Sequence, residues 1–148
     1  MAIIMVDERD KRIIEILRKD ARTANTEIAQ KLDISEAAVR NRVNELQDKG
    51  VIKRFTIDVD PRKLGFNSIA IVGADVEPDC FLEAAEKLAE FDEVRDISLT
   101  TGDHMIMMEI WAEDEGQLTT ILSEKVGKVE GIQRICPAVV LENLKNGF

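Results

Sequence analysis

The order of apolar segments between residues 68 and 141 constrains the fold most strongly. Runs with strand character alternate with amphipathic helical segments. The predicted strands cover residues 68–76, 94–101, 104–112 and 132–141, and the predicted helices cover 78–91 and 113–128. This β-α-β-β-α-β order predicts a ferredoxin-like domain, with two helices on one face of a four-stranded sheet. Gly102-Asp103, between the second and third strands, is predicted to form a hairpin turn.

The predicted strands are apolar at both alternating sets of positions. In the first strand, for example, Ile69 and Ile71 alternate with Ala70 and Val72. An antiparallel sheet with one face in water normally shows polar residues at every second position. The second face is therefore predicted to be buried against another copy of the chain, which makes at least a homodimer. A monomer with an unusually apolar sheet is the alternative.

Residues 1–60 show a different, helical pattern. A first helix is predicted over 7–20, a short second helix capped by Asn25 or Thr26, and a third helix that follows Ser35 and ends near Lys49. Asp33 suits a sharp turn between the second and third helices. Residues 51–60 are predicted to be extended, as a wing or strand. The overall class is thus α+β, with domains at 1–60 and 67–148 joined by a hinge at 61–66.

The charge distribution separates the two parts. The net charge is −9, yet residues 1–60 hold 12 acidic and 12 basic side chains, whereas residues 61–148 hold 17 acidic and 8 basic ones. A neutral first part with a local basic patch can bind DNA, but the acidic second part is repelled by phosphate. Two distant cysteines and one histidine argue against a disulfide scaffold and a zinc site. No apolar run is long enough for a signal peptide or a membrane span, so we expect a cytoplasmic protein.

The third predicted helix presents side chains that can read base pairs. Its buried positions are Val39, Val43 and Leu46, and the opposite face carries arginine and asparagine. Arginine pairs bidentately with guanine and asparagine with adenine, whereas other basic side chains meet phosphates. The alternative is an ordinary solvated helix face. The predicted DNA-binding residues are Ser35, Glu36, Ala37, Arg40, Asn41, Arg42, Asn44, Lys53 and Arg54.

Motifs along the whole chain resemble those of one family, the leucine-responsive regulatory protein (Lrp/AsnC) transcription regulators. In the second part, Thr101-Gly102-Asp103 is similar to the family's Thr-Gly-Asp loop, and Gly131-Ile132 also fits. The motifs in the first part are Val6-Asp7-Glu8-Arg9-Asp10, Ile13-Ile14-Glu15-Ile16-Leu17, Asp20-Ala21-Arg22-Thr23, Glu27-Ile28-Ala29, residues 34–43, residues 50–55 and residues 61–65.

The resemblance implies a transcription regulator with a winged helix-turn-helix and an effector domain. Members of the family dimerise through their sheets and often form octamers or larger assemblies. Many bind a free amino acid near the Thr-Gly-Asp loop, and no other cofactor and no metal are expected here. The implied effector residues are Thr100, Thr101, Gly102, Asp103 and His104.

Each of these residues has a suitable chemistry. Loop N–H groups and the two threonine hydroxyls can hold a carboxylate, Asp103 can accept from an ammonium group, and His104 can donate a hydrogen bond. The alternative for the loop is a turn without a ligand. The last strand departs from the family, because Ile135-Cys136-Pro137-Ala138-Val139 lacks the hydroxyl residues that often help to bind the effector.

Two other functions remain open at this point. The chain can be a ligand-independent partner that assembles with related regulators. More remotely, it can be a tetrapyrrole decarboxylase of similar fold, although the chain has no tyrosine and a single histidine to donate protons.

Overall fold

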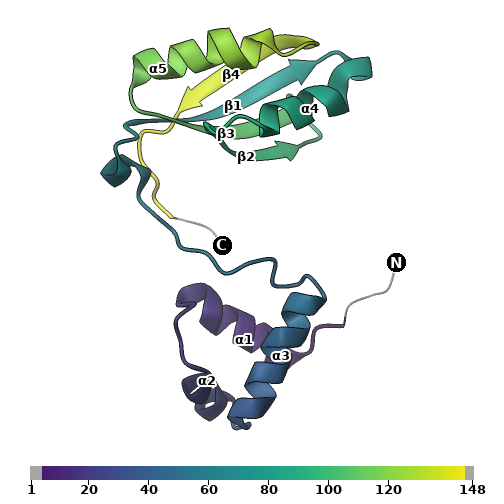
Figure 1. Ribbon diagram of the computed structural model, residues 1–148, viewed down its shortest axis with the longest axis vertical. Helices are drawn as coiled ribbons and strands as arrows, with labels where there is room; N and C mark the ends of the chain where they lie inside the picture. The colour runs from purple at the N-terminus through teal and green to yellow at the C-terminus, as the bar shows by residue number, and fades with distance from the viewer. Residues whose placement is uncertain (1–4, 146–148) are drawn as a thin grey trace. The chain divides into compact units, whose positions relative to one another are not determined.

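The computed structural model describes residues 5–145, and the apolar start of the chain at residues 1–4 lies outside them. The chain forms two compact units, with the break between Asp58 and Val59. The first unit contains the helices α1 (Glu8–Lys19), α2 (Asn25–Leu32) and α3 (Glu36–Asp48), shown in Figure 1. No helix in the described part of the chain is long and apolar enough to cross a membrane.

The helix boundaries follow local capping chemistry in two of the three cases. At α1, the Asp7 carboxylate accepts from the Asp10 N–H at 2.8 Å, and the Asp10 carboxylate accepts from the Asp7 N–H at 3.2 Å. At α3, the Ser35 hydroxyl accepts from the Ala38 N–H at 3.1 Å, as predicted. The predicted cap of α2 is wrong, because Ala24 precedes the first turn without a side-chain hydrogen bond and Asn25 is already helical.

The first unit is held together by a small core. Ile13, Ile28 and Val39 are fully buried, and Ala29 and Leu32 are nearly so. Asp33 has φ 52° and ψ 51°, so it makes the predicted left-handed turn between α2 and α3. These contacts and this turn confirm the three-helix arrangement.

The predicted wing does not form a strand in the structure. Residues 53–60 carry no helix or strand, and Phe55 and Ile57 are exposed. A strand requires a neighbouring backbone that accepts and donates its hydrogen bonds. Among residues 5–145, the sheet contains only four strands, and this segment is not one of them.

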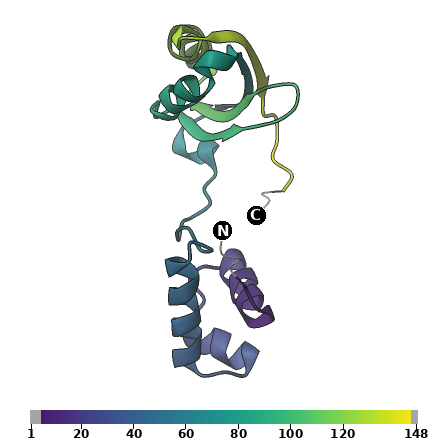
Figure 2. The ribbon, with the colours of Figure 1, turned by 90° about the vertical axis from the view of Figure 1, so that its right-hand side faces the viewer.

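The second unit is the predicted ferredoxin-like fold. Its strands are β1 (Ser68–Val76), β2 (Val94–Leu99), β3 (Ile106–Ala112) and β4 (Ile132–Val139), in the order β2-β3-β1-β4 with every pair antiparallel. The helices α4 (Phe81–Ala89) and α5 (Glu115–Thr120) lie on one face of this sheet (Figures 1 and 2). A π-helical turn, Ile121–Lys125, and a 3-10 turn, Val126–Lys128, continue α5.

The predicted hinge at 61–66 belongs instead to the second unit. Pro61–Leu64 forms a 3-10 turn, and the Arg62 guanidinium donates to the carbonyl oxygens of Val140 at 2.9 Å and Leu141 at 2.8 Å. Phe66 packs on Trp111, with 5.5 Å between ring centroids. These long-range contacts fix the segment, so the link between the units lies before Val59.

The two sides of the sheet differ. Toward the helices, β1 and β3 bury Ala70, Val72, Ala74, Val76, Ile106, Met108, Ile110 and Ala112. The alternate residues form the other side, which we call the open face: Ile69, Ile71, Gly73 and Asp75 of β1, Met107, Glu109 and Trp111 of β3, and Arg134, Cys136 and Ala138 of β4.

The open face mixes apolar and polar groups. Ile71 is 37% exposed, and Glu109 lies directly opposite it on β3. The Trp111 indole donates to the Glu109 carboxylate at 2.5 Å, so this acid has a partner on its own strand. The Arg95 guanidinium stacks 4.9 Å from the Trp111 ring centroid.

Candidate DNA-binding and effector sites

The exposed side of α3 has the chemistry of a recognition helix. Ala37, Arg40, Asn41 and Asn44 are all exposed, whereas Val39 is fully buried against α1 and α2. The burial of Val39 and the Ser35 cap therefore fix the orientation of α3, with this face exposed to solvent. The structure brings the predicted Arg and Asn side chains together on one accessible surface, with Ser35 and Glu36 at its start.

Arg40 is held in place by a weak interaction. Its guanidinium binds the Glu36 carboxylate at 2.7 Å, one helical turn away, and both side chains are about half exposed at 55% and 47%. An exposed pair of this kind contributes only about 0.3–0.5 kcal/mol. Arg40 can therefore leave Glu36 for a base edge at little cost.

Arg42 does not lie on this exposed face. Its Nη1 atom donates to Asp7 at 2.7 Å and to Asp10 at 2.8 Å, and its side chain is 28% exposed. It ties α3 to the capped start of α1. In the free protein Arg42 thus belongs to an ion-pair network within the unit, and its DNA contact stays a prediction, whereas Lys53 and Arg54 are exposed in the segment after α3.

Replacing Arg42 with methionine is expected to weaken the first unit at neutral pH and less so in acid. Hydrogen bonds from the Asp10 N–H and from Arg42 hold the pKa of Asp7 below its ordinary value of 3.8. The ionised carboxylate thus adds stability above that value, and this stability is lost as pH falls through the lowered pKa. We expect Arg42→Met to lower the thermal midpoint by a few degrees at about pH 7 and by less at about pH 2.

Thermal unfolding followed by circular dichroism measures both midpoints. Arg40→Met is the matched control, because it removes an exposed pair and should change little at either pH. An equal loss for Arg42→Met at both pH values would show that its carboxylate partners are not responsible.

The predicted effector residues lie in a loop that is longer than a hairpin turn. β2 ends at Leu99 and β3 begins at Ile106, so residues 100–105 connect them. The Thr100 N–H donates to the Met105 carbonyl at 2.9 Å, and the Thr100 hydroxyl donates to the His104 carbonyl at 2.5 Å. Thr100 therefore closes the loop. Its hydroxyl was predicted to hold a carboxylate, but in this structure the hydroxyl proton is donated to the His104 carbonyl instead.

The tip of this loop is accessible. Thr101, Gly102 and Asp103 are exposed, and Gly102 has φ 140°, a conformation that side chains rarely allow. An added Cβ at Gly102 would meet nothing within 4 Å. Backbone N–H groups, the Thr101 hydroxyl and the Asp103 carboxylate are thus open to a small polar ligand.

The imidazole of His104 lies directly on β1. A Cβ atom added to Gly73 would come within 3.0 Å of three of its atoms, Cδ2, Cγ and Nε2. The Nδ1 atom is 3.2 Å from the Asp75 carboxylate, and the two side chains are 22% and 26% exposed. Residues of the loop and of β1 therefore form one polar cluster at the end of the open face.

The contact with Asp75 affects which ring nitrogen of His104 can face a ligand. A carboxylate without a proton only accepts hydrogen bonds, so in a contact between such a carboxylate and a neutral ring Nδ1 is the donor and Nε2 is left as an acceptor. In that tautomer the ring can accept a hydrogen bond from a ligand, for example from an ammonium group. Donation from Nε2 requires the protonated ring.

Sequence reasoning missed Gly73 and Asp75 as members of this cluster. Strand alternation places them on the same side as Ile69 and Ile71, and a glycine inside a strand signals the close approach of another group. On β4, the residues opposite them are Cys136 and Arg134.

Pro137 lies on an edge strand, as expected for a residue without an N–H group.

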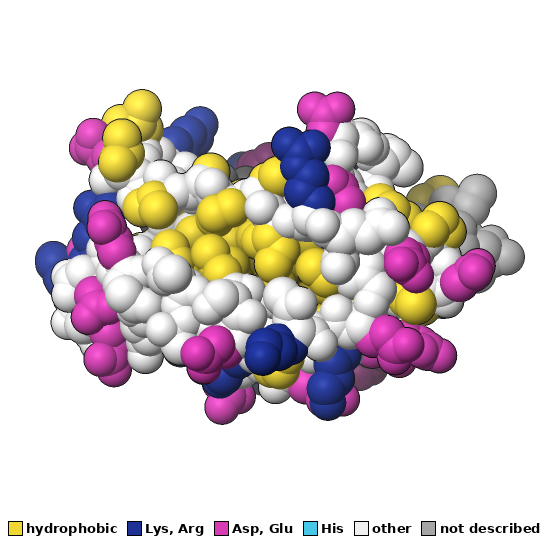
Figure 3. Space-filling view, turned by 90° about the horizontal axis from the view of Figure 1, so that it is seen from above, with side chains coloured by type: hydrophobic (Ala, Val, Ile, Leu, Met, Phe, Trp, Pro, Cys, Tyr) yellow, Lys and Arg dark blue, Asp and Glu magenta, His cyan; other side chains and the backbone are white. Residues whose placement is uncertain are grey.

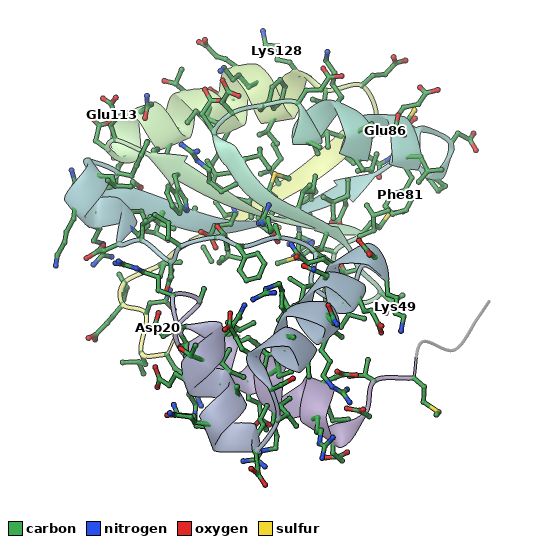
Figure 4. All side chains as sticks on the ribbon, turned by 60° about the horizontal axis from the view of Figure 1, so that its bottom comes forward. Asp20, Lys49, Phe81, Glu86, Glu113 and Lys128 are labelled. Carbon is green, nitrogen blue, oxygen red and sulfur yellow. The ribbon has the colours of Figure 1, made fainter. Side chains whose placement is uncertain are left out.

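A groove of about 550 Å³ lies on the other side of the second unit, beside α4 and the π-helical turn. Figure 3 looks down on this unit, where hydrophobic side chains gather among charged ones, and Figure 4 labels Glu86 and Lys128 on the outer side of the helices. The groove is lined by Cys80, Glu83, Ala84, Lys87, Phe91, Glu124, Lys125, Lys128, Val129 and Glu130.

The charges of this groove largely cancel. Lys87 pairs with Glu90 at 2.8 Å, and Lys125 pairs with Glu93, where it holds the pKa of Glu93 below its usual value. Burial and nearby acids such as Glu77 raise the pKa of the Cys80 thiol, so it is a poor nucleophile. The groove therefore favours no particular ligand chemistry.

Comparison with known proteins identifies the family of each unit. Residues 6–53 match a family model for winged helix-turn-helix DNA binding, and residues 69–148 match the Lrp/AsnC ligand binding domain. The chain is 55% identical over 141 residues to the transcriptional regulator LrpA of Pyrococcus horikoshii, covering 95% of this chain and 100% of that protein. It is 36% identical to the regulator LrpA1 of Halobacterium salinarum, covering 94% and 98%.

Solved structures show the same architecture. Escherichia coli AsnC superposes with a TM-score of 0.88 at 28% identity, covering 97% of each chain. A Neisseria meningitidis regulator in complex with L-Met also has a TM-score of 0.88, at 18% identity and covering 96% and 94%. Because the matching relatives are named as transcriptional regulators, the decarboxylase alternative is not supported. The chain belongs to the Lrp/AsnC family of DNA-binding transcription regulators.

Proposed function

We propose that this regulator binds specific DNA sequences and that a free amino acid, bound at the loop of residues 100–105, changes its assembly or its DNA affinity. The observation that carries the proposal is the exposed tip of this loop beside the His104–Asp75 pair. A carboxylate fits the Thr101 hydroxyl and the backbone N–H groups around Gly102, which has no side chain to block a ligand. An ammonium group fits the Asp103 carboxylate.

Two comparisons support an amino acid as the ligand class. The second unit matches a domain model that is described as ligand binding. The Neisseria meningitidis regulator, which has the same fold, was solved with L-Met. The effector of this chain is therefore sought first among the free amino acids.

We also propose a cytoplasmic homodimer that forms through the open face and assembles further, to an octamer or a larger ring. Ile71 is 37% exposed at the centre of this face, and Met107 and Trp111 are partly exposed beside it. Large apolar side chains on an otherwise folded sheet favour burial against a second copy.

One observation favours a second candidate, a ligand-independent regulator that assembles with its relatives. The Ile135-Cys136-Pro137-Ala138-Val139 segment offers no hydroxyl group to a ligand. Of these residues, Cys136 lies on the open face beside Gly73. The contribution of this strand to an effector site is thus limited to Cys136 and the backbone.

The test measures binding to the DNA upstream of the protein's own gene against random competitor DNA. It is made at a stated salt concentration, with and without the common amino acids. Preferential binding that shifts with an amino acid supports the effector-gated regulator, and preferential binding without a shift supports the second candidate. The absence of any preference contradicts sequence-specific binding.

Arg40→Ala is expected to reduce binding to the preferred DNA sequence by about 1–3 kcal/mol, or roughly 5- to 150-fold, because it removes a bidentate contact to guanine. Binding to random DNA should fall much less. Fluorescence anisotropy with both DNAs measures the two affinities. Lys31→Ala is the control for a basic side chain that meets phosphate, because Lys31 is exposed and pairs with Glu27 one helical turn away. An equal loss of both affinities for Arg40→Ala would show that Arg40 contacts phosphate.

A further inference from the structure

We propose that Gly73 is a positioning residue of the effector site. Because Gly73 has no side chain, the imidazole of His104 can lie against β1. There the Asp75 carboxylate fixes the orientation and the tautomer of the imidazole. This inference rests on the proposed effector function of the loop of residues 100–105. It adds a residue of the central sheet, outside the loop, to the parts that the effector response requires.

The close approach of the two residues leaves no room for a methyl group. A Cβ at Gly73 would lie 2.6 Å from Cγ and 3.0 Å from Nε2 of the imidazole, both inside normal van der Waals distance. The imidazole is a rigid ring, so it cannot bend away as the end of a lysine or methionine side chain can. One of the two elements has to move when a side chain is added.

The ring is the element that yields. β1 is a central strand, hydrogen bonded to β3 on one side and to β4 on the other, with Gly73 opposite Met107 and Cys136. The loop belongs to no strand, and its hydrogen bonds from Thr100 to the backbone of His104 and Met105 lie within the loop itself. A methyl group at Gly73 therefore lifts the imidazole off β1 and lengthens the 3.2 Å contact between Nδ1 and Asp75.

Losing the contact between His104 and Asp75 changes which ring nitrogen a ligand can bind. With Nδ1 bound to Asp75, the neutral ring presents Nε2 as an acceptor in a fixed place. Without it, either nitrogen can carry the proton, and a ligand donor loses a defined partner. A binding group with an unmatched partner typically loses about tenfold or more in affinity.

The first measurement needs no ligand. His104 is the only histidine of the chain, so its imidazole nitrogens can be assigned directly in a long-range ¹H–¹⁵N NMR spectrum of the full chain. We expect the Nδ1–H tautomer in the unchanged protein and a mixture of tautomers in Gly73→Ala. Gly116→Ala is the matched control, since its added Cβ meets only Asp114 Oδ1, at 3.3 Å, and should leave the imidazole signals unchanged. Unchanged imidazole signals in Gly73→Ala would overturn the inference.

The second measurement follows the shift in DNA affinity caused by each common amino acid. We expect Gly73→Ala to need about tenfold or more of the active amino acid for the same shift, and Gly116→Ala to respond as the unchanged protein does. In a His104→Ala background, adding Gly73→Ala should change nothing further, because the ring that it displaces is absent. An additional loss in the double variant, or a normal response of Gly73→Ala alone, would contradict a positioning role.

Two further outcomes are separated by the same variants. If Gly73→Ala does not fold, circular dichroism of the double variant Gly73→Ala/His104→Ala shows whether the clash with the ring is the cause. Removing the imidazole makes room for the added methyl group, so the double variant should fold. A double variant that also fails to fold overturns the inference. If the unchanged protein responds to none of the amino acids, the proposed effector function fails. The imidazole spectrum still decides whether Gly73 positions His104, so the two failures are distinguishable.

Discussion

Ile28→Ala is expected to unfold most of the first unit and abolish DNA binding. Ile28 is fully buried, in a cluster with Ile13 and Val39 that joins all three helices. Truncating a buried isoleucine to alanine costs about 2–5 kcal/mol, because it removes apolar contacts and leaves a cavity. A unit of this size has a stability of only a few kcal/mol, so a loss of about 3 kcal/mol removes most of it.

Urea unfolding followed by circular dichroism, together with DNA binding, measures this loss. Ile57→Ala is the matched control, since it makes the same truncation at a side chain that is 81% exposed. It should change the free energy of unfolding by less than about 0.5 kcal/mol. The sheet unit has a separate core, so the strand signal should survive in Ile28→Ala. Comparable losses for the two variants would show that Ile28 does not carry the core.

The parts of the fold that depend on local chemistry could be predicted from the sequence. Ser35 caps α3 and Asp33 takes the left-handed turn, because both roles depend on the residue's own side chain and backbone. The order β-α-β-β-α-β follows from apolar periodicity, and with it the topology of the sheet. At this level the sequence was sufficient.

Features that depend on distant partners could not be predicted. Arg62 looks like part of a flexible link, but it binds the carbonyl of Val140, 78 residues away. Arg42 looks like one more basic residue on a recognition helix, but Asp7 and Asp10 hold it, 35 and 32 residues earlier. In both cases the residue type permits two roles, and only the tertiary fold decides between them.

The proposed effector site shows the same limit. A turn was predicted between the second and third strands, and Thr101, Gly102 and Asp103 are exposed in the loop found there. The sequence did not predict that Thr100 uses its hydroxyl to close the loop, or that Gly73 and Asp75 receive the His104 ring. Gly73 and Asp75 come close to the loop only when β1 pairs with β3, across about 30 residues of sequence.

Ile71→Lys is expected to dissociate the proposed homodimer while leaving the folded sheet intact. In the single chain, a lysine at this position lies directly opposite Glu109, and such opposite charges across a strand pair contribute about 0.2–1 kcal/mol. In a dimer formed through the open face, each copy would bury this added charge, which costs several kcal/mol per ion. The dissociation constant should therefore rise by about two orders of magnitude or more.

Sedimentation velocity over a range of protein concentrations measures this change, and circular dichroism confirms that the sheet remains folded. Leu82→Lys is the matched control: Leu82 is 65% exposed at the start of α4, on the opposite side of the sheet, so the same charge there should leave the assembly unchanged. Dissociation by Leu82→Lys but not by Ile71→Lys would place the interface on the helices instead of the open face. Because burial of the lysine in both copies is what opposes association, restoring a neutral side chain with Ile71→Met should restore the dimer.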